Sequence, residues 1–230
     1  MLIYAALAVN LLCALLPWSL SCHRTMGAVN IAGHLAVFAL VSVQAFLLGA
    51  PGALNGAFRA DALSLFFMFA IATVALAAAL YSKGYIDRET EEGHIGGKAA
   101  GLYYSLFSIF TLSMFLVTLA ENLGLMWVYV ETTTLASAFL VGFHTTKKAI
   151  EAAWKYVIIC SVGLVLALLG VILFRYAQGG GTGTLGWSDM MAHARELHPG
   201  LVRTAFIFVL VGYGTKAGLV PMHTWLPDAH

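Results

Sequence analysis

The sequence predicts an all-α protein, a polytopic bundle of about seven transmembrane helices, on three observations. First, 60% of the 230 residues are hydrophobic and only 10% are charged, whereas soluble domains carry about 25% charged residues. Second, stretches of about 20 apolar residues recur along the chain, the length that a helix needs to cross a hydrocarbon core of ~30 Å. Third, the alternating polarity that is typical of membrane barrel strands is absent from the sequence.

The apolar stretches set the expected spans. Each carries at most one Asp, Glu, Lys or Arg, and they are residues 1–22, 27–50, 62–82, 101–120, 123–143, 152–174 and 204–222. Between them, residues 83–100 predict a charged loop, and residues 175–203 predict a glycine-rich turn followed by a short amphipathic stretch at 187–198. His23 and Arg24 come after the first span and not before it, which favours an external amino terminus.

Composition also narrows the expected partners and cofactors. A net charge of +1 offers no basic excess to neutralise phosphates, so nucleic acid is not an expected partner. The apolar spans make the lipid bilayer an expected partner. The cysteines, Cys13, Cys22 and Cys160, are too far apart for a disulfide framework or a zinc site. The glycine run at 179–183 lacks the Gly-Lys-Ser/Thr that ends a phosphate-binding loop. We therefore expect no cofactor, no metal and no redox centre on this chain.

Ionisable side chains inside the spans are the candidate functional residues. Glu131, Lys155 and Lys216 each interrupt an otherwise uncharged span, and such a residue costs about 2.5–3.5 kcal/mol on insertion scales. At 1.5 Å per helical residue, Glu131 lies roughly 13 Å from the outer end of its span and Lys216 roughly 20 Å from the outer end of its own. Lys155 lies only ~5 Å from the inner end. It is therefore either a member of an ion path or an interfacial anchor that snorkels to the surface.

A buried glutamate and a buried lysine suit proton transfer. Burial disfavours the charged form of each group, and an opposite charge nearby restores it, so separating or closing the pair moves a proton. Hydroxyl side chains surround Glu131, and Tyr213 lies one helical turn before Lys216. Because threonines in membrane helices also serve only in packing, the sequence leaves their role as a relay open.

The last span is expected to be broken near its lysine. It contains Gly212, Gly214 and Gly218 and then Pro221, and proline removes a backbone donor and clashes with the preceding turn. Broken helices beside intramembrane charges are a recurring feature of transport sites. The glycines also permit close packing of helices, which is the alternative interpretation.

Three histidines complete the set of candidates. His223 and His230 follow the predicted break and are weak signals on their own. His34 is the one ionisable residue of the second span, and we expect it to be a packing histidine whose ring nitrogens are satisfied.

Three segments together resemble a known family. They are Trp127-Val-Tyr-Val-Glu131-Thr-Thr-Thr-Leu-Ala, Glu151-Ala-Ala-Trp-Lys155-Tyr and Gly214-Thr-Lys216-Ala-Gly-Leu-Val-Pro-Met-His223-Thr-Trp-Leu-Pro-Asp-Ala-His230. They resemble the antiporter-like membrane subunits shared by respiratory complex I, the Mrp sodium/proton antiporters and the membrane-bound hydrogenases, and most of all the hydrogenase-4 component F type. The resemblance implies that Glu131, Lys155 and Lys216 form one half-channel for protons, with His223 and His230 near the broken helix.

The resemblance also predicts domain organisation and function. Family members are longer and are built from two inverted repeats, so we expect a fragment: helices and inner loop at 1–100, then an incomplete first repeat at 101–230. The expected function is a proton-translocating (alternatively Na⁺-translocating) subunit of a hydrogenase-4, formate hydrogenlyase or complex I type of complex in the cell inner membrane. Its partners would be other membrane subunits of a respiratory or hydrogenase complex, and the electron chemistry would lie on them. The alternatives are a non-transporting scaffold in the same complex, or a subunit of an Mrp-type antiporter.

Overall fold

The computed structural model describes residues 1–20, 22–179 and 184–229, and these form two compact units. The N-terminal unit consists of Met1–Asn55 and Arg59–Leu119, and the C-terminal unit of Gly56–Phe58 and Ala120–His230. Within the described residues, seven helical segments are long and apolar enough to cross a membrane. The predicted all-α bundle of about seven spans is therefore confirmed. The predicted repeat at 101–230 concerns internal symmetry, which the division into units does not test.

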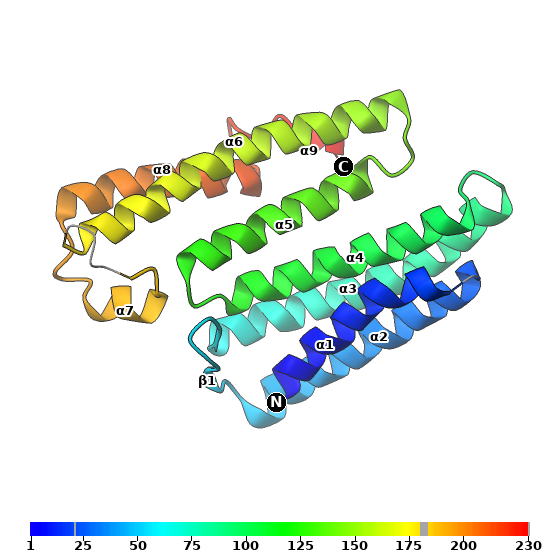
Figure 1. Ribbon diagram of the computed structural model, residues 1–230, viewed down its shortest axis with the longest axis horizontal. Helices are drawn as coiled ribbons and strands as arrows, with labels where there is room; N and C mark the ends of the chain where they lie inside the picture. The colour runs from blue at the N-terminus through cyan, green and yellow to red at the C-terminus, as the bar shows by residue number, and fades with distance from the viewer. Residues whose placement is uncertain (21, 180–183, 230) are drawn as a thin grey trace. The chain divides into compact units, whose positions relative to one another are not determined.

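The N-terminal unit is an up-and-down bundle of four long helices (Figure 1). α1 (Leu2–Leu15) continues into a 3-10 turn, and α2 (His23–Val43) into a π turn at Gln44–Leu48. β1 (Gly52–Ala53) and β2 (Arg59–Ala60) pair antiparallel between α2 and α3. α3 (Ala62–Glu91) and α4 (Gly97–Leu119) complete the unit. The starts of α2 and α4 and the end of α3 therefore lie at the same end of the unit.

The predicted charged loop at 83–100 is largely helical. α3 continues through its charged residues to Glu91 and α4 begins at Gly97, which leaves only residues 92–96 between them. Glu, Lys and Arg are good helix formers, and Lys83 and Asp87 form an ion pair one turn apart at 2.7 Å. The loss of the apolar pattern marks the exit from the membrane and not the end of the helix. At 30 residues, α3 is about 45 Å long.

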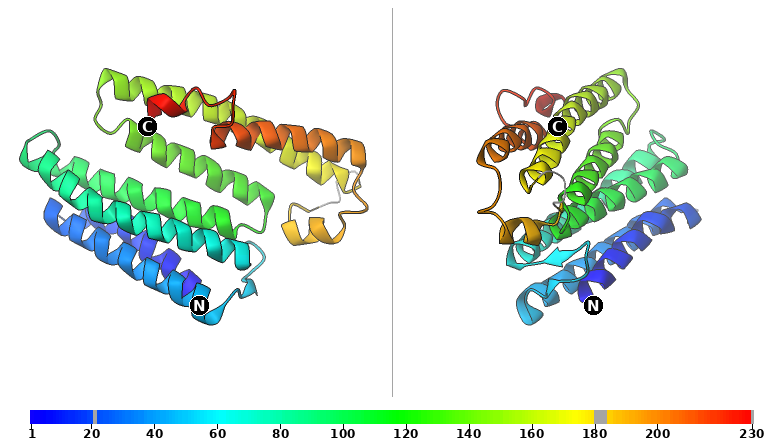
Figure 2. Two further views of the ribbon diagram at one scale, coloured as in Figure 1. Left: turned by 180° about the vertical axis from the view of Figure 1, so that it is seen from behind. Right: turned by 60° about the vertical axis from the view of Figure 1, so that its left-hand side comes forward.

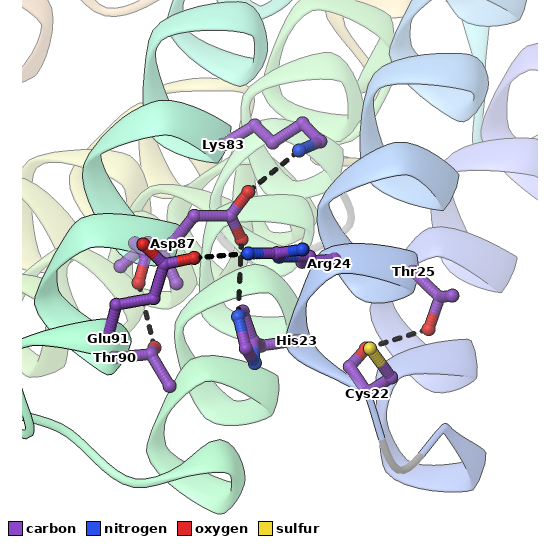
Figure 3. Close-up of polar contacts among 9 residues, drawn as sticks. Cys22, His23, Arg24, Thr25, Lys83, Asp87, Thr90 and Glu91 are labelled. Carbon is purple, nitrogen blue, oxygen red and sulfur yellow. Dashed lines mark hydrogen bonds and ion pairs between the residues drawn. The ribbon is translucent and has the colours of Figure 1, made fainter.

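Polar contacts join the start of α2 to the end of α3 (Figure 3). The Arg24 guanidinium donates to the Glu91 carboxylate at 2.5 Å, and both side chains are mostly exposed. His23 Nε2 lies 3.8 Å from Asp87 Oδ1, and Lys83 Nζ donates to Asp87 Oδ2. These contacts place Arg24 and His23 of α2 against the carboxylates of Glu91 and Asp87 on α3.

The C-terminal unit is built around α6 (Lys147–Ala177), which packs on one side against α5 (Leu123–Val141) and on another against α8 (Pro199–Ala217). α6 and α8 lie side by side in every view (Figures 1 and 2). The short helices α7 (Trp187–Ala192) and α9 (Leu226–Ala229) precede and follow α8. α7 occupies the first half of the predicted amphipathic stretch. Most of the predicted glycine turn, residues 180–183, lies outside the described residues.

Side-chain caps fix where these helices begin. Asn122 Oδ1 accepts from the amides of Gly124 and Leu125 at the start of α5, and Thr146 Oγ1 accepts from Ala149 at the start of α6. Such caps satisfy amides that have no partner within the helix. In the N-terminal unit, Asp61 caps α3 in the same way, and the Ser64 amide that donates to it lowers the pKa of the Asp61 carboxyl.

Glycines bring α6 and α8 into close contact. A Cβ atom on Gly212 would lie 2.5 Å from the Ala167 amide nitrogen and 2.6 Å from the Gly163 carbonyl oxygen. A Cβ atom on Gly163 would lie 2.6 Å from Thr215 Cβ. The packing interpretation of Gly212 is therefore correct. This close contact fixes the position of the end of α8 along α6.

Candidate functional site

Lys216 is the penultimate residue of α8, directly at the predicted break. The helix ends at Ala217, Gly218 has a φ of 76°, and the Leu219 amide donates back to the Gly214 carbonyl oxygen at 2.9 Å. This is the pattern of a Schellman cap, which requires a left-handed residue and so favours glycine. The predicted break is present, but the helix ends five residues before the predicted end of the span at 222. The Lys216 ammonium consequently lies at the negative end of the α8 dipole.

Tyr156 of α6 is the direct partner of Lys216. The Lys216 ammonium donates a hydrogen bond to the Tyr156 hydroxyl and lies 4.7 Å from the centre of the Tyr156 ring. Tyr156 is only 4% exposed. Its ring packs against Trp225 at 4.8 Å, and the Trp225 indole donates to the Thr215 carbonyl oxygen at 2.9 Å. The segment after the break therefore folds back and holds Tyr156 against the end of α8.

The Tyr156 hydroxyl continues into a row of hydroxyls on α5. It is hydrogen-bonded to Ser137 Oγ at 2.7 Å and also interacts with the Thr134 hydroxyl. Thr133 and Thr134 are both buried and bond to the backbone of their own helix. Two of the hydroxyl residues that the sequence places around Glu131, Thr134 and Ser137, thus interact with Tyr156, the partner of Lys216.

Glu131 is held by a different side chain of α6. Ser161 Oγ donates to Glu131 Oε1 at 2.9 Å, while Glu131 Oε2 is enclosed and has no hydrogen-bond partner among the described residues. Glu131 and Lys216 interact electrostatically. Among the ion pairs of the described residues, however, none within 4.0 Å joins them. The structure therefore brings the two predicted residues into one neighbourhood and leaves them unpaired, with Tyr156 bonded to the lysine.

Lys155 points to other partners than its neighbour Tyr156 does. Its ammonium pairs with Glu151 at 2.8 Å, one turn away on α6, and with Asp228 of α9 at 2.9 Å. The three side chains are each about half exposed. Lys155 therefore ties α6 to the segment after the break, a contact that neither of its predicted roles included.

The histidine candidates are distributed between the two units. His223, in the turn between α8 and α9, has an enclosed Nδ1 without a partner, and no described contact joins it to Lys216. His230 lies outside the described residues. His34 lies in the N-terminal unit, is buried and packs on Phe107, as expected of a packing histidine, but only its Nδ1 is hydrogen-bonded and its Nε2 has no partner among the described residues.

Sequence reasoning missed Tyr156, Ser161 and Asp228 as site residues. Tyr156 and Asp228 both stand inside the segments that carry the family resemblance, directly after Lys155 and Pro227, so their place in these segments was a usable signal. Ser161 gave no such signal, because it is one of several small polar residues in an apolar span.

Taken together, the helices and the site define a multi-pass membrane protein with a lysine at a broken helix and a glutamate nearby. Two family models match the chain. The model described as NADH:quinone oxidoreductase/Mrp antiporter, transmembrane region, matches residues 120–230, and the one described as the N-terminus of NADH-ubiquinone oxidoreductase (complex I) chain 5 matches residues 51–93.

Similar proteins extend this result. The chain is 40% identical to the hydrogenase-4 component F homolog of Methylacidiphilum infernorum (isolate V4), over 75% of this chain and 37% of that protein. It is 33% identical to hydrogenase-4 component B of Escherichia coli (strain K12), over 75% and 24%. Respiratory complex I from Thermus thermophilus contains a chain with a TM-score of 0.78 and 23% identity, which covers 100% of this chain and 47% of that one.

The chain belongs to the antiporter-like membrane subunit family of complex I, the Mrp antiporters and the membrane-bound hydrogenases. It spans less than half the length of these relatives.

Proposed function

We propose that this chain belongs to a proton-translocating subunit of an energy-converting oxidoreductase complex of hydrogenase-4 or complex I type in the cell inner membrane. Its partners would be the other membrane subunits of that complex, which would also carry the electron chemistry. The observation that supports this proposal is the position of Lys216: at a helix end inside a span, bonded to a hydroxyl, near a carboxylate with which it is not paired.

The proposed relay uses Glu131 and Lys216 as the two groups whose protonation changes. When Glu131 approaches Lys216, the opposite charges stabilise each other and Lys216 holds its proton. When they separate, burial disfavours both charges, so Lys216 releases a proton or Glu131 takes one. Glu131 Oε2, which has no hydrogen-bond partner among the described residues, is available to bind either the Lys216 ammonium or a proton.

Tyr156 gives the relay a second state for the lysine. The Tyr156 hydroxyl accepts a hydrogen bond from the Lys216 ammonium. When Lys216 loses its proton, the same hydroxyl can rotate and donate to the lysine amine, because a hydroxyl both donates and accepts. Ser137 remains its other partner in both states. Tyr156 thus holds Lys216 away from Glu131 without a charge of its own.

Lys155 and His223 remain proposed members of the relay. Lys155, in the amino-terminal third of α6, forms ion pairs with both Glu151 and Asp228. In the proposed relay, a proton passes between its ammonium group and these carboxylates. The unpartnered Nδ1 of His223 is free to accept a proton or a water hydrogen.

The test compares variants in the complete complex, reconstituted in vesicles with assembly measured separately. Glu131→Gln keeps the acceptor for Ser161 and removes the charge, so we expect normal assembly and a large loss of proton translocation. Lys216→Met should have the same effect. Lys216→Arg should also impair translocation, because a guanidinium does not deprotonate in proteins.

A matched control and the possible outcomes make the test decisive. Lys147→Arg, at the exposed first residue of α6, should leave translocation unchanged. Normal translocation with Glu131→Gln would contradict the proposal and support the scaffold alternative. Full activity of Lys216→Arg would show that the lysine is a structural cation. A rate that follows the Na⁺ gradient and not the pH gradient would support the Mrp-type alternative.

A further inference from the structure

The N-terminal unit contains a line of buried and partly buried polar side chains that the proposed relay does not use. They come from three helices: His23, Asn30 and His34 on α2, Asp87 on α3, and Tyr104 and Ser105 on α4. We call these six residues the polar column. His23, Asn30 and His34 are spaced at seven and four residues, which places them on one face of α2. The column covers about 16 Å along that helix.

Each residue of the column has at least one buried polar atom without a hydrogen-bond partner among the described residues. These atoms are His23 Nε2, Asn30 Oδ1, His34 Nε2, Asp87 Oδ1, Tyr104 OH and Ser105 Oγ. Asn30, His34, Tyr104 and Ser105 are at most 2% exposed. Buried polar atoms in folded proteins are almost always paired with protein or with ordered water. A series of them along one face is therefore the environment in which buried water binds.

Several contacts bring the helices that carry the column together at the level of its residues. Asn30 Nδ2 donates to Ser108 Oγ at 3.1 Å, which links α2 to α4. Near the helix ends, a Cβ atom on Gly27 would lie 2.8 Å from the Tyr104 hydroxyl and 2.9 Å from Lys83 Cγ. The Tyr104 hydroxyl therefore lies against α2, between the levels of His23 and Asn30. Figure 3 shows the end of the column at the start of α2, where His23 faces Asp87.

The tautomer of His34 follows from its one described hydrogen bond. His34 Nδ1 lies 2.9 Å from the Asn30 carbonyl oxygen. A carbonyl only accepts, so Nδ1 carries the hydrogen, and in the neutral ring Nε2 is a bare acceptor. The ring packs on Phe107 with centroids 4.9 Å apart, which fixes its orientation. The deepest ring of the column thus holds a free lone pair.

The titratable groups that face the column lie at the end formed by the starts of α2 and α4 and the end of α3. On α2 they are His23 and Arg24, on α3 they are Lys83, Asp87 and Glu91, and α4 contributes the Tyr104 phenol. Arg24 and Lys83 each have a carboxylate partner, so the acidic and basic charges at this end are balanced. Of these described groups, His23 Nε2, Asp87 Oδ1 and the Tyr104 hydroxyl have no hydrogen-bond partner, and His23 Nε2 and Asp87 Oδ1 lie 3.8 Å from each other.

We propose that the polar column is a hydrated proton-binding site within the N-terminal unit: it holds ordered water, and His34 Nε2 accepts a hydrogen bond or a proton through that water. His23 and Asp87 form its mouth at the ends of α2 and α3. The ligands are water and the proton. This site involves none of the residues of the Glu131–Lys216 relay, so it can be present or absent independently of the proposed function.

X-ray hydroxyl-radical footprinting of the complete complex tests the water. Radicals formed from a bound water modify the aromatic side chain next to it. Tyr104 and Phe115 are both fully buried aromatic residues of α4, and only Tyr104 belongs to the column. We expect Tyr104 to be modified several-fold faster than Phe115. Equal, slow modification of the two would show that the column is dry and would overturn the proposal.

A matched pair of variants locates the water. Ser105→Val replaces an unpartnered buried hydroxyl, whereas Ser113→Val replaces a hydroxyl of equal burial on the same helix that is bonded to the Phe110 carbonyl oxygen. Only Ser105→Val should lower the modification of Tyr104. An equal effect of both would contradict the column. The wild-type comparison stands even if a variant does not assemble.

Nitrogen-15 NMR of histidine-labelled complex tests the proton acceptor. The His34 signals are assigned by their loss in His34→Phe, which keeps a ring against Phe107. We expect the tautomer with hydrogen on Nδ1, a hydrogen-bonded Nε2 and exchange with D₂O. The opposite tautomer, or a ring that does not exchange, would reduce the column to a packing feature and would overturn the proton-binding role.

Discussion

The two units differ in the buried polar groups that they contain and in how many of these groups have a side-chain partner. In the C-terminal unit, each intramembrane charge has a direct side-chain partner: Lys216 has Tyr156, Glu131 has Ser161, and Lys155 has two carboxylates. In the N-terminal unit, the buried polar groups of α2 and α4 are neutral, and many of their described atoms have no protein partner. An uncompensated charge is far more costly inside a membrane than an unpaired neutral group. Charges therefore need protein partners, whereas neutral groups can be left to water.

The largest expected effect comes from the contact that supports the charged site. Gly212→Ala places a Cβ atom 2.5 Å from the backbone of Ala167, and backbone atoms of α6 cannot rotate away. Overpacking of this kind typically costs about 1–3 kcal/mol, sometimes more. Gly212→Ala would therefore force α8 away from α6. We expect it to lower the thermal stability of the complete complex strongly, as measured by a melting experiment in detergent.

Two other glycines serve as controls for Gly212. A Cβ atom on Gly214 would meet only the end of Leu219, at 3.1 Å, and one on Gly27 in the N-terminal unit would meet the side-chain atoms of Tyr104 and Lys83. Gly214→Ala should be tolerated, and Gly27→Ala should have an intermediate effect. If all three variants melted alike, the closeness of α6 and α8 would not be what positions Lys216.

The next effect separates bonded from unbonded hydroxyls within one unit. Tyr156→Phe keeps the ring under Lys216 and removes its hydrogen-bond acceptor. A hydrogen bond to a charged group contributes about 1.5–3 kcal/mol, and about 1.36 kcal/mol of barrier corresponds to a tenfold change in rate. We therefore expect proton translocation to fall roughly tenfold or more, with assembly retained, in the vesicle assay.

Tyr213→Phe is the matched control for Tyr156→Phe. Tyr213 lies on α8 in the same unit, and its hydroxyl is enclosed without a partner among the described residues. Removing an unsatisfied hydroxyl should leave translocation unchanged. An effect of Tyr213→Phe equal to that of Tyr156→Phe would contradict the specific role of the Tyr156 hydroxyl.

The sequence predicted the fold far better than the contacts of the site. Apolar length identifies all seven spans because the bilayer imposes one thickness on every helix. It fails at helix ends: α3 runs through charged residues to Glu91, and α8 ends at Ala217 because of Gly218. The charges Glu131 and Lys216 stand out against an apolar background and were predicted.

The partners of those charges could not be predicted in the same way. Ser161 resembles the other small polar residues of its span, and Tyr156 stands out only by its place in a family motif. The contacts of both residues depend on which face of α6 meets α5 or α8. The one-residue difference between Lys155 and Tyr156 sends their side chains to different neighbours. Periodicity in a span that is apolar on all sides does not specify that rotation.

The smallest expected effect concerns the cysteines, which report on both units at once. Cys22 is exposed between the first two spans, and the pKa of its thiol is lowered by the amides of Thr25 and Arg24 and, more weakly, by the Arg24 guanidinium. A lowered pKa means that the thiolate is present at lower pH than for an ordinary cysteine. Cys13 in the N-terminal unit and Cys160 in the C-terminal unit are buried, at 3% and 0% exposure.

We therefore expect a maleimide to modify Cys22 selectively in the folded complex, and to do so at a lower pH than it modifies an ordinary exposed cysteine. Arg24→Gln should shift the pH profile of this reaction only slightly upward, because the two backbone amides are the larger cause and remain. Peptide mapping after graded labelling measures all three sites. Labelling of Cys160 at the rate of Cys22 would mean that α6 is open next to Tyr156, and labelling of Cys13 would mean that α1 has separated from α2. Either result would contradict the burial of that cysteine in its unit.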